Sequence, residues 1–247
     1  MYRSLVLVTA LAAEIGSATV GVSWSFPDAE QPQNGLNDVT FPFDLSKAPH
    51  EDGFYFAQQF FFNGVESGAY TGLQPRPDNS SGSVIHAVFS SFIKGTTFNS
   101  PLCYAGADGG DGVSCAVQFT GDYSHEYGCV VETTDEGSTW RGTVVDAVSG
   151  ESHAMGEWTL PKKAAGIQTQ GAGFVEYYIY PRDSAGNEIC DEMPLTEISF
   201  FSPSSNTSGA NEGTLGQPYE YGVCEGKSAF STQQITDGYC VKTGFQI

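Results

Sequence analysis

Short segments that alternate apolar and polar residues, separated by glycine-rich turns, make up most of this 247-residue sequence. In GFVEYYIYPR, for example, a period of two places Phe174, Glu176, Tyr178 and Tyr180 on one face of a strand. The 30 glycines and 12 prolines supply frequent turns between such segments. The pattern predicts an all-β fold, an antiparallel two-sheet sandwich of jelly-roll (concanavalin-like) type, with a closed barrel as the alternative.

The segment FYFAQQFFF, residues 54–62, is nearly continuous in apolar and aromatic residues. Alternation places Phe54, Phe56 and Gln58 on one face, and the run predicts a central strand that is covered on both sides. TWRGTVVDAV and HAMGEWTL are expected to pair across the turn VSGES, and CAVQF and EYGCVVET to form the preceding antiparallel hairpin. No segment predicts a helix, a repeat or a linker.

The N-terminal segment has a basic residue, Arg3, an apolar run and then small residues up to Ala18. It predicts a signal peptide at residues 1–18, followed by a single β-sandwich domain at residues 19–247 of a secreted, extracellular protein. An uncleaved anchor is the alternative, although an apolar run of about nine residues is too short to span a bilayer.

The chain carries 29 acidic and 10 basic side chains, a formal net charge of −19. Such a surface repels phosphate backbones and polyanions, which argues against nucleic acid and acidic polysaccharides as partners. No later segment is apolar and long enough for a membrane span, and we expect a monomer without a membrane partner.

Six cysteines lie beyond the predicted signal peptide, an even number that predicts three disulfides in an oxidising compartment. Spacing leaves the 15 possible pairings open, although two cysteines bracket the turn AGADGGDG and suggest a pinned loop there. The cysteines are Cys103, Cys115, Cys129, Cys190, Cys224 and Cys240. Sequons at Asn79 and Asn206 predict glycosylated surface loops.

The same glycine-rich turn holds Asp108 and Asp111. Two carboxylates and free backbone carbonyls on a flexible loop suit calcium, which takes six to eight oxygen ligands. Calcium is therefore the one cofactor that the sequence suggests, with a plain acidic turn as the alternative.

Aromatic and polar residues on the predicted strands could bind sugar rings, since flat aromatic surfaces suit the apolar faces of pyranoses. The alternative is that these aromatics pack in the core or across strands. The candidate ligand-binding residues are Tyr178, Tyr180, Glu176, Arg182, Trp140, Trp158, Gln58 and Gln74.

Catalytic candidates are weaker. Glycoside hydrolysis needs two carboxyl groups on either side of a bond, and Glu157 and Glu176 lie on predicted strands. A lyase would need a base such as His86 with Gln58 or Gln74 beside it. Signatures of a zinc protease helix, a serine nucleophile elbow and a phosphate loop are each incomplete.

The sequence resembles an uncharacterised family of secreted domains from bacteria and fungi. The resemblance lies in the order of its segments, which are FYFAQQFFF, YTGLQ, VFSSF, the acidic turn closing on Cys115, WRGTVVDAVSGESHAMGEWTLP and VEYY. The resemblance covers about half of the chain. It implies an extracellular β-sandwich, often beside carbohydrate-processing modules, and carries no known active site. Family members tend to have Trp-Asp where this chain has Phe92 and Ile93, and Glu in the turn where Asp108 or Asp111 stands.

Together these patterns predict a secreted protein that binds a neutral glycan on an aromatic-lined concave face. One alternative is an enzyme, a glycoside hydrolase or polysaccharide lyase, that cleaves the glycan on that face. Another is a structural or host-interaction protein without a small ligand.

Overall fold

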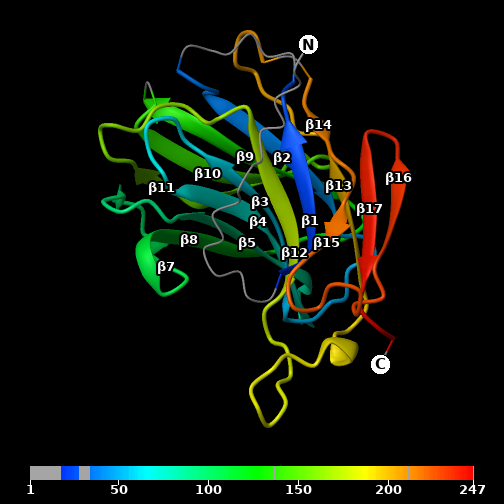
Figure 1. Ribbon diagram of the computed structural model, residues 1–247. Helices are drawn as coiled ribbons and strands as arrows, with labels where there is room; N and C mark the ends of the chain where they lie inside the picture. The colour runs from blue at the N-terminus through cyan, green and yellow to red at the C-terminus, as the bar shows by residue number, and fades with distance from the viewer. Residues whose placement is uncertain (1–17, 28–33, 136, 211, 247) are drawn as a thin grey trace, which may run out of the picture.

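A computed structural model describes residues 18–27, 34–135, 137–210 and 212–246 (Figure 1). In these residues the chain forms two antiparallel sheets packed as a sandwich, as the alternation predicted. The predicted signal peptide, apart from Ala18, lies outside the described residues. None of the described residues form a helix long and apolar enough to cross a membrane.

The nine-stranded sheet has the order β14-β1-β12-β3-β4-β5-β8-β7, and β15 also pairs with β1. Its strands are β1 (Ala18–Ser25), β3 (Phe54–Phe61), β4 (Gly68–Asn79), β5 (Gly82–Ser91), β7 (Cys103–Ala107), β8 (Gly110–Thr120), β12 (Gln170–Tyr177), β14 (Thr214–Leu215) and β15 (Tyr219–Glu220).

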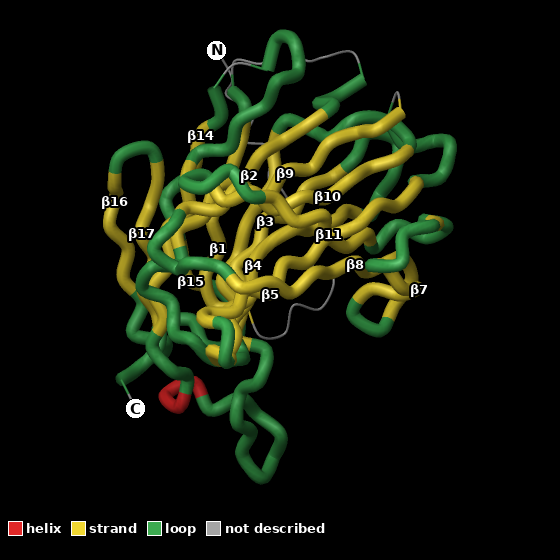
Figure 2. The backbone as a smooth tube through the Cα atoms, turned by 180° about the vertical axis from the view of Figure 1, so that it is seen from behind, coloured by secondary structure: helices red, strands yellow, loops and turns green. Residues whose placement is uncertain are grey.

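The eight-stranded sheet has the order β16-β17-β13-β2-β9-β10-β11-β6. Its strands are β2 (Asp38–Asp44), β6 (Thr97–Phe98), β9 (Glu126–Asp135), β10 (Thr139–Asp146), β11 (Ser152–Thr159), β13 (Thr196–Phe201), β16 (Ser231–Ile235) and β17 (Gly238–Thr243). The 3₁₀ helix Cys190–Glu192 follows β12. From behind, the β16–β17 hairpin stands at the edge opposite β7 (Figure 2).

Strand β3 shows why the sequence folds into two layers. Phe54, Phe56 and Phe60 enter the core between the sheets, while Tyr55 and Ala57 belong to a second apolar cluster on the opposite face. We call this opposite side the outer face of the nine-stranded sheet. The strand lies between β12 and β4 and is covered on both sides, so the prediction for this segment is confirmed.

The predicted β10–β11 hairpin is also confirmed, with Trp140 directly opposite Trp158. The predicted pairing of β8 with β9 is wrong, because β8 lies in the nine-stranded sheet and β9 in the eight-stranded one. Residues 121–125 between them cross from one sheet to the other, a connection that local alternation cannot distinguish from a hairpin turn.

Two disulfides form, Cys103–Cys115 and Cys190–Cys224. The first pins the glycine-rich turn as expected. The third predicted disulfide is wrong, because Cys129 and Cys240 are free. They lie on β9 and β17, which are separated by β13 and β2 in the sheet, and three strand spacings of about 4.8 Å exceed the reach of a disulfide.

Candidate functional site on the outer face

The strongest cluster of polar residues on the outer face is a row that crosses adjacent strands. Glu176 on β12 pairs with Tyr55 on β3, and Gln74 on β4 pairs with His86 on β5. Phe56 pairs with Leu73, so their neighbours Tyr55 and Gln74 come side by side. We call Glu176, Tyr55, Gln74 and His86 the polar row. Only the pairing register brings these four together.

Glu176 has the electrostatic character of an acid–base group. Burial, and then the charges of Asp108 and Glu188, raise the pKa of its carboxyl from 4.5 to about 7. Among the described residues, none hydrogen-bonds or ion-pairs with this carboxyl. The shift therefore comes from poor solvation and neighbouring negative charge, and it allows the group to exchange a proton near neutral pH.

Gln74 lies two strands from Glu176, so their Cα atoms are about 10 Å apart. Arg76 donates a hydrogen bond from Nη2 to Oε1 of Gln74 and another from Nη1 to the hydroxyl of Tyr178, at 3.0 Å for the latter. Its Nε pairs with Asp52 at 3.2 Å. Because Arg76 occupies Oε1, the Nε2 amide of Gln74 remains as a donor on the outer face.

His86 stays neutral at most pH values. Burial, and then the charge of Arg76, lower the pKa of its imidazole to about 4. The ring is half-buried and lies opposite Gln118 on the next strand. A neutral imidazole can donate or accept a hydrogen bond, but it contributes no positive charge to the row.

Tyrosine hydroxyls and the glycine-rich turn complete this side of the sheet. The hydroxyl of Tyr70 donates to Asp108, whose two oxygens lie at 3.0 and 3.3 Å. The Tyr55 ring packs edge-on against those of Tyr70 and Phe174, with centroids 5.1 and 5.5 Å away. The Tyr55 hydroxyl is buried without a hydrogen-bond partner in the described structure. The site is thus a carboxyl and an amide set among aromatic rings.

The predicted calcium site does not assemble in the described part of the chain. Asp108 binds Tyr70, whereas Asp111 pairs with Lys94 at 3.3 Å. The described residues contain no group of three or more His, Cys, Asp or Glu side chains placed to hold a metal.

Most of the predicted aromatic platform lies elsewhere. Trp140 and Trp158 are buried in the core, with exposed fractions of 0% and 1%. Gln58 is also buried between the sheets, on the inner face of β3. Strand β12 ends at residue 177, so Tyr178 lies in the following turn and Tyr180 folds back into the core, where its hydroxyl contacts Met193. The ligand-binding predictions for Trp140, Trp158 and Tyr180 are wrong because bulky aromatic rings gain more from the core than from solvent. Gln58 is wrong as well because its side chain is buried between the sheets, whereas Tyr178 is 37% exposed and its role stays a prediction.

The remaining predicted residues lie in three different places. Glu176, Gln74 and His86 meet in the polar row. Glu157 lies on the other sheet and pairs with Arg141 at 3.2 Å, and Arg182 pairs with Glu188 at 3.1 Å in the loop after β12.

Sequence reasoning missed Tyr55, Tyr70 and Arg76 as parts of the site. Alternation does place Tyr55 on the face opposite Phe54 and Phe56. The signal that was lacking is the cross-strand register, which only the assembled sheet supplies.

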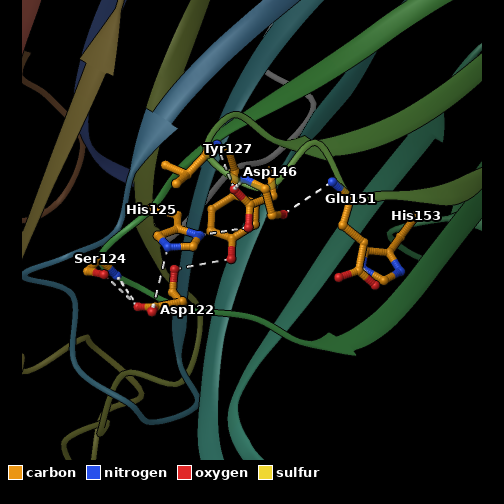
Figure 3. Close-up of polar contacts among 9 residues, drawn as sticks. Asp122, Ser124, His125, Tyr127, Asp146, Glu151 and His153 are labelled. Atoms are coloured by element: carbon orange, nitrogen blue, oxygen red, sulfur yellow. Dashed lines mark hydrogen bonds and ion pairs between the residues drawn. The ribbon is translucent and has the colours of Figure 1, made fainter.

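A second polar cluster lies around His125 at one end of the sandwich (Figure 3). His125 Nδ1 lies 2.7 Å from Asp146, an arrangement found in hydrolases with a serine nucleophile. However, the hydroxyl of Ser124 donates to Asp122 at 2.7 Å rather than to the imidazole. This cluster therefore lacks an activated nucleophile.

No family model matches the chain, and no curated protein matches it. Solved structures with similar folds include scytalido-glutamic peptidase with a peptide-based transition-state analogue, at 10% identity and a TM-score of 0.47, covering 92% of this chain and 98% of that one. Another is SCP-B, a member of the eqolisin family of peptidases, in complex with the tripeptide Ala-Ile-His, at 10% identity and a TM-score of 0.44, covering 92% and 98%. Likeness at this level leaves the activity of the present chain open.

The prediction that this protein recognises a neutral glycan on an aromatic-lined face is wrong. Its aromatic platform does not exist, because Trp140, Trp158 and Tyr180 are core residues. The alternative of glycan cleavage by Glu157 and Glu176 fails as well, since these carboxyls lie on different sheets.

Proposed function

We propose that this protein is a peptide-bond hydrolase in which Glu176 is the acid–base group and Gln74 binds the carbonyl oxygen. The observation that carries the proposal is the polar row, in which a carboxyl of raised pKa and an oriented amide flank Tyr55. Amide hydrolysis by water needs a base for the water and a donor for the developing oxyanion, and the row contains one of each.

The reaction needs no covalent intermediate. The ionised carboxylate of Glu176 takes a proton from a water molecule as the water oxygen bonds to the peptide carbonyl carbon. The Nε2 amide of Gln74 donates a hydrogen bond to the oxygen that becomes negative. When the carbon–nitrogen bond breaks, protonated Glu176 returns the proton to the leaving amine, which balances the step.

Peptides are preferred over glycosides because of the carboxyl count on the outer face. Glycoside hydrolysis needs a second carboxyl across the scissile bond, and the nearby Asp108 is engaged by the Tyr70 hydroxyl. Ser90 and Ser114, two serines of this face that lie beside Tyr70, hydrogen-bond to each other at 3.1 Å, so attack by water is favoured over attack by either of them.

The two disulfides are consistent with folding in an oxidising compartment. With the predicted signal peptide, they support secretion as part of the proposal. Asn79 and Asn206 are exposed, so glycosylation there stays a prediction.

The test is proteolysis of a peptide mixture, followed by mass spectrometry between about pH 4 and 9. Glu176→Gln should lower kcat/KM by at least about 100-fold, the usual contribution of a general base. The matched control is Glu157→Gln, an exposed carboxyl on the other sheet, which should leave cleavage unchanged. Wild-type kcat/KM should rise with pH up to about 7 as Glu176 ionises. Absence of cleavage by the wild type, or equal cleavage by Glu176→Gln, would refute the proposal.

A further inference from the structure

Three of the four histidines, His50, His125 and His153, gather at one end of the sandwich. His50 lies in residues 45–53, which cross from β2 to β3. His125 lies in residues 121–125, which cross from β8 to β9, and His153 lies near the start of β11. Both crossings connect the two sheets, so contacts between them affect how firmly this end of the sandwich is held.

His125 connects residues 121–125, the crossing from β8 to β9, to the β10–β11 hairpin (Figure 3). Its Nδ1 lies 2.7 Å from Asp146, and its Nε2 lies 3.7 Å from Asp122. Asp146 also accepts hydrogen bonds from the backbone N–H groups of Val148 and Ser149, at 2.8 and 3.0 Å. The Asp146 carboxylate thus binds both the turn of the β10–β11 hairpin and the imidazole of His125.

His50 links the first crossing to the second and to the β4–β5 hairpin. Its Nδ1 lies 2.6 Å from Asp78 and 3.4 Å from the hydroxyl of Ser83. Its ring lies 4.1 Å from the ring of Tyr123 in the second crossing. Tyr123 in turn donates a hydrogen bond to the carbonyl of Val84, at 2.7 Å.

His153 links the two sheets directly. Its ring stacks on Phe119 of β8, with centroids 4.1 Å apart, and its Nε2 lies 3.5 Å from Glu151. His125 and His153 line a shared cavity of about 490 Å³ that Asp146 and Tyr127 also border. Each of the three histidines therefore has at least one carboxylate partner.

We propose that His50, His125 and His153 form a pH-sensitive clamp that ties both crossings to the β4–β5 and β10–β11 hairpins, and that tightens as the imidazoles take up protons. Protonation converts each neutral contact into an ion pair, and neighbouring pairs that share one end of the fold act as a network. The titratable and charged groups facing the three rings are Asp78, Asp122, Asp146, Glu151, Tyr123 and Tyr127, with Asp52 and Arg76 beside Tyr123.

The direction follows from the charges. The hydrogen bond to Asp146 raises the pKa of His125 above its ordinary value, despite an opposing effect of burial. Burial alone would raise the pKa of Asp146, but the contacts with His125, Ser149 and Val148 hold it far below its ordinary value. The carboxylate is therefore ionised whenever the imidazole is charged. The contact between His125 and Asp146 is therefore strongest while the imidazole is protonated, and it weakens as the pH rises through the raised pKa of His125.

The test is hydrogen–deuterium exchange of residues 119–127 at about pH 5 and pH 8, corrected for the intrinsic pH dependence of exchange. In the wild type, protection of this segment should fall roughly tenfold at the higher pH, beyond any change in β3. The triple variant H50Q/H125Q/H153Q should show the same low protection at both pH values. The matched control H86Q alters the fourth histidine, which is neutral at both pH values because its pKa is about 4, and should behave as wild type.

Equal protection at the two pH values in the wild type overturns the clamp, as does a triple variant that keeps the full change. If the triple variant does not fold, the singles D78N and E151Q replace it, and each should reduce the pH effect. Retention of the full effect in both singles also overturns the proposal. None of these results depends on peptide hydrolysis.

Discussion

The raised pKa of Glu176 predicts a pH-dependent loss of stability that one substitution removes. The carboxyl is half-buried on the outer face, where burial and the charges of Asp108 and Glu188 disfavour its ionised form. In the unfolded chain the same group is solvated. The folded state therefore binds this proton more tightly than the unfolded state does, and folding stability depends on pH through this group.

The magnitude follows from the two pKa values. The shift from 4.5 to about 7 is about 2.5 pH units, and one unit corresponds to about 1.36 kcal/mol, which gives about 3 kcal/mol. The folded pKa is the higher one, so this stabilisation is fully present below pH 4.5. It is lost as the pH rises through about 7.

The assay is urea denaturation with the disulfides intact, at steps between about pH 4.5 and 8.5, for the wild type and Glu176→Gln. Glutamine cannot ionise, so the variant should gain about 3 kcal/mol relative to the wild type from the acidic to the basic end. Other titrating groups, His125 among them, cancel in the difference.

A wild-type-to-Glu176→Gln difference that stays constant over this range would refute the reasoning, because the carboxyl would then titrate alike in both states. A difference of the opposite sign would show that the folded protein stabilises the carboxylate. Either result would also remove the electrostatic support for Glu176 as a base near neutral pH.

Three further changes test other parts of the structure. Arg76→Met should raise the pKa of His86 above about 4, because the guanidinium charge contributes to lowering it; an NMR titration that finds no change contradicts this. Trp158→Ala should lower the free energy of unfolding by about 3 to 5 kcal/mol, since the buried ring stacks on the core residue Phe89. A loss below about 1 kcal/mol in urea denaturation would contradict that packing. Replacing Cys103 and Cys115 by alanine removes a disulfide with a sequence separation of 12. The free energy of unfolding should fall by about 3 kcal/mol in the same assay. Unchanged stability would mean that the disulfide does not constrain the unfolded chain.

The sequence by itself determined the local features of this protein. Alternating side chains and glycine turns specified strands with two distinct faces, and the near-continuous apolar run of β3 specified a strand covered on both sides. The bracketing of the acidic turn by Cys103 and Cys115 likewise indicated a pinned loop. These predictions succeeded because each depends on residues close together in the chain.

Tertiary structure decided the site. Glu176 and Gln74 are about 100 residues apart in sequence, and they meet only because β12 and β4 flank β3 in a particular register. A shift of one residue would turn every side chain of a strand to the opposite face. Burial of Trp140 and Trp158, and the separation of the free Cys129 from the free Cys240, also depend on which strands become neighbours. Strand formation is a local preference, whereas strand order and register minimise the free energy of the whole sandwich, and so they could not be inferred from short segments.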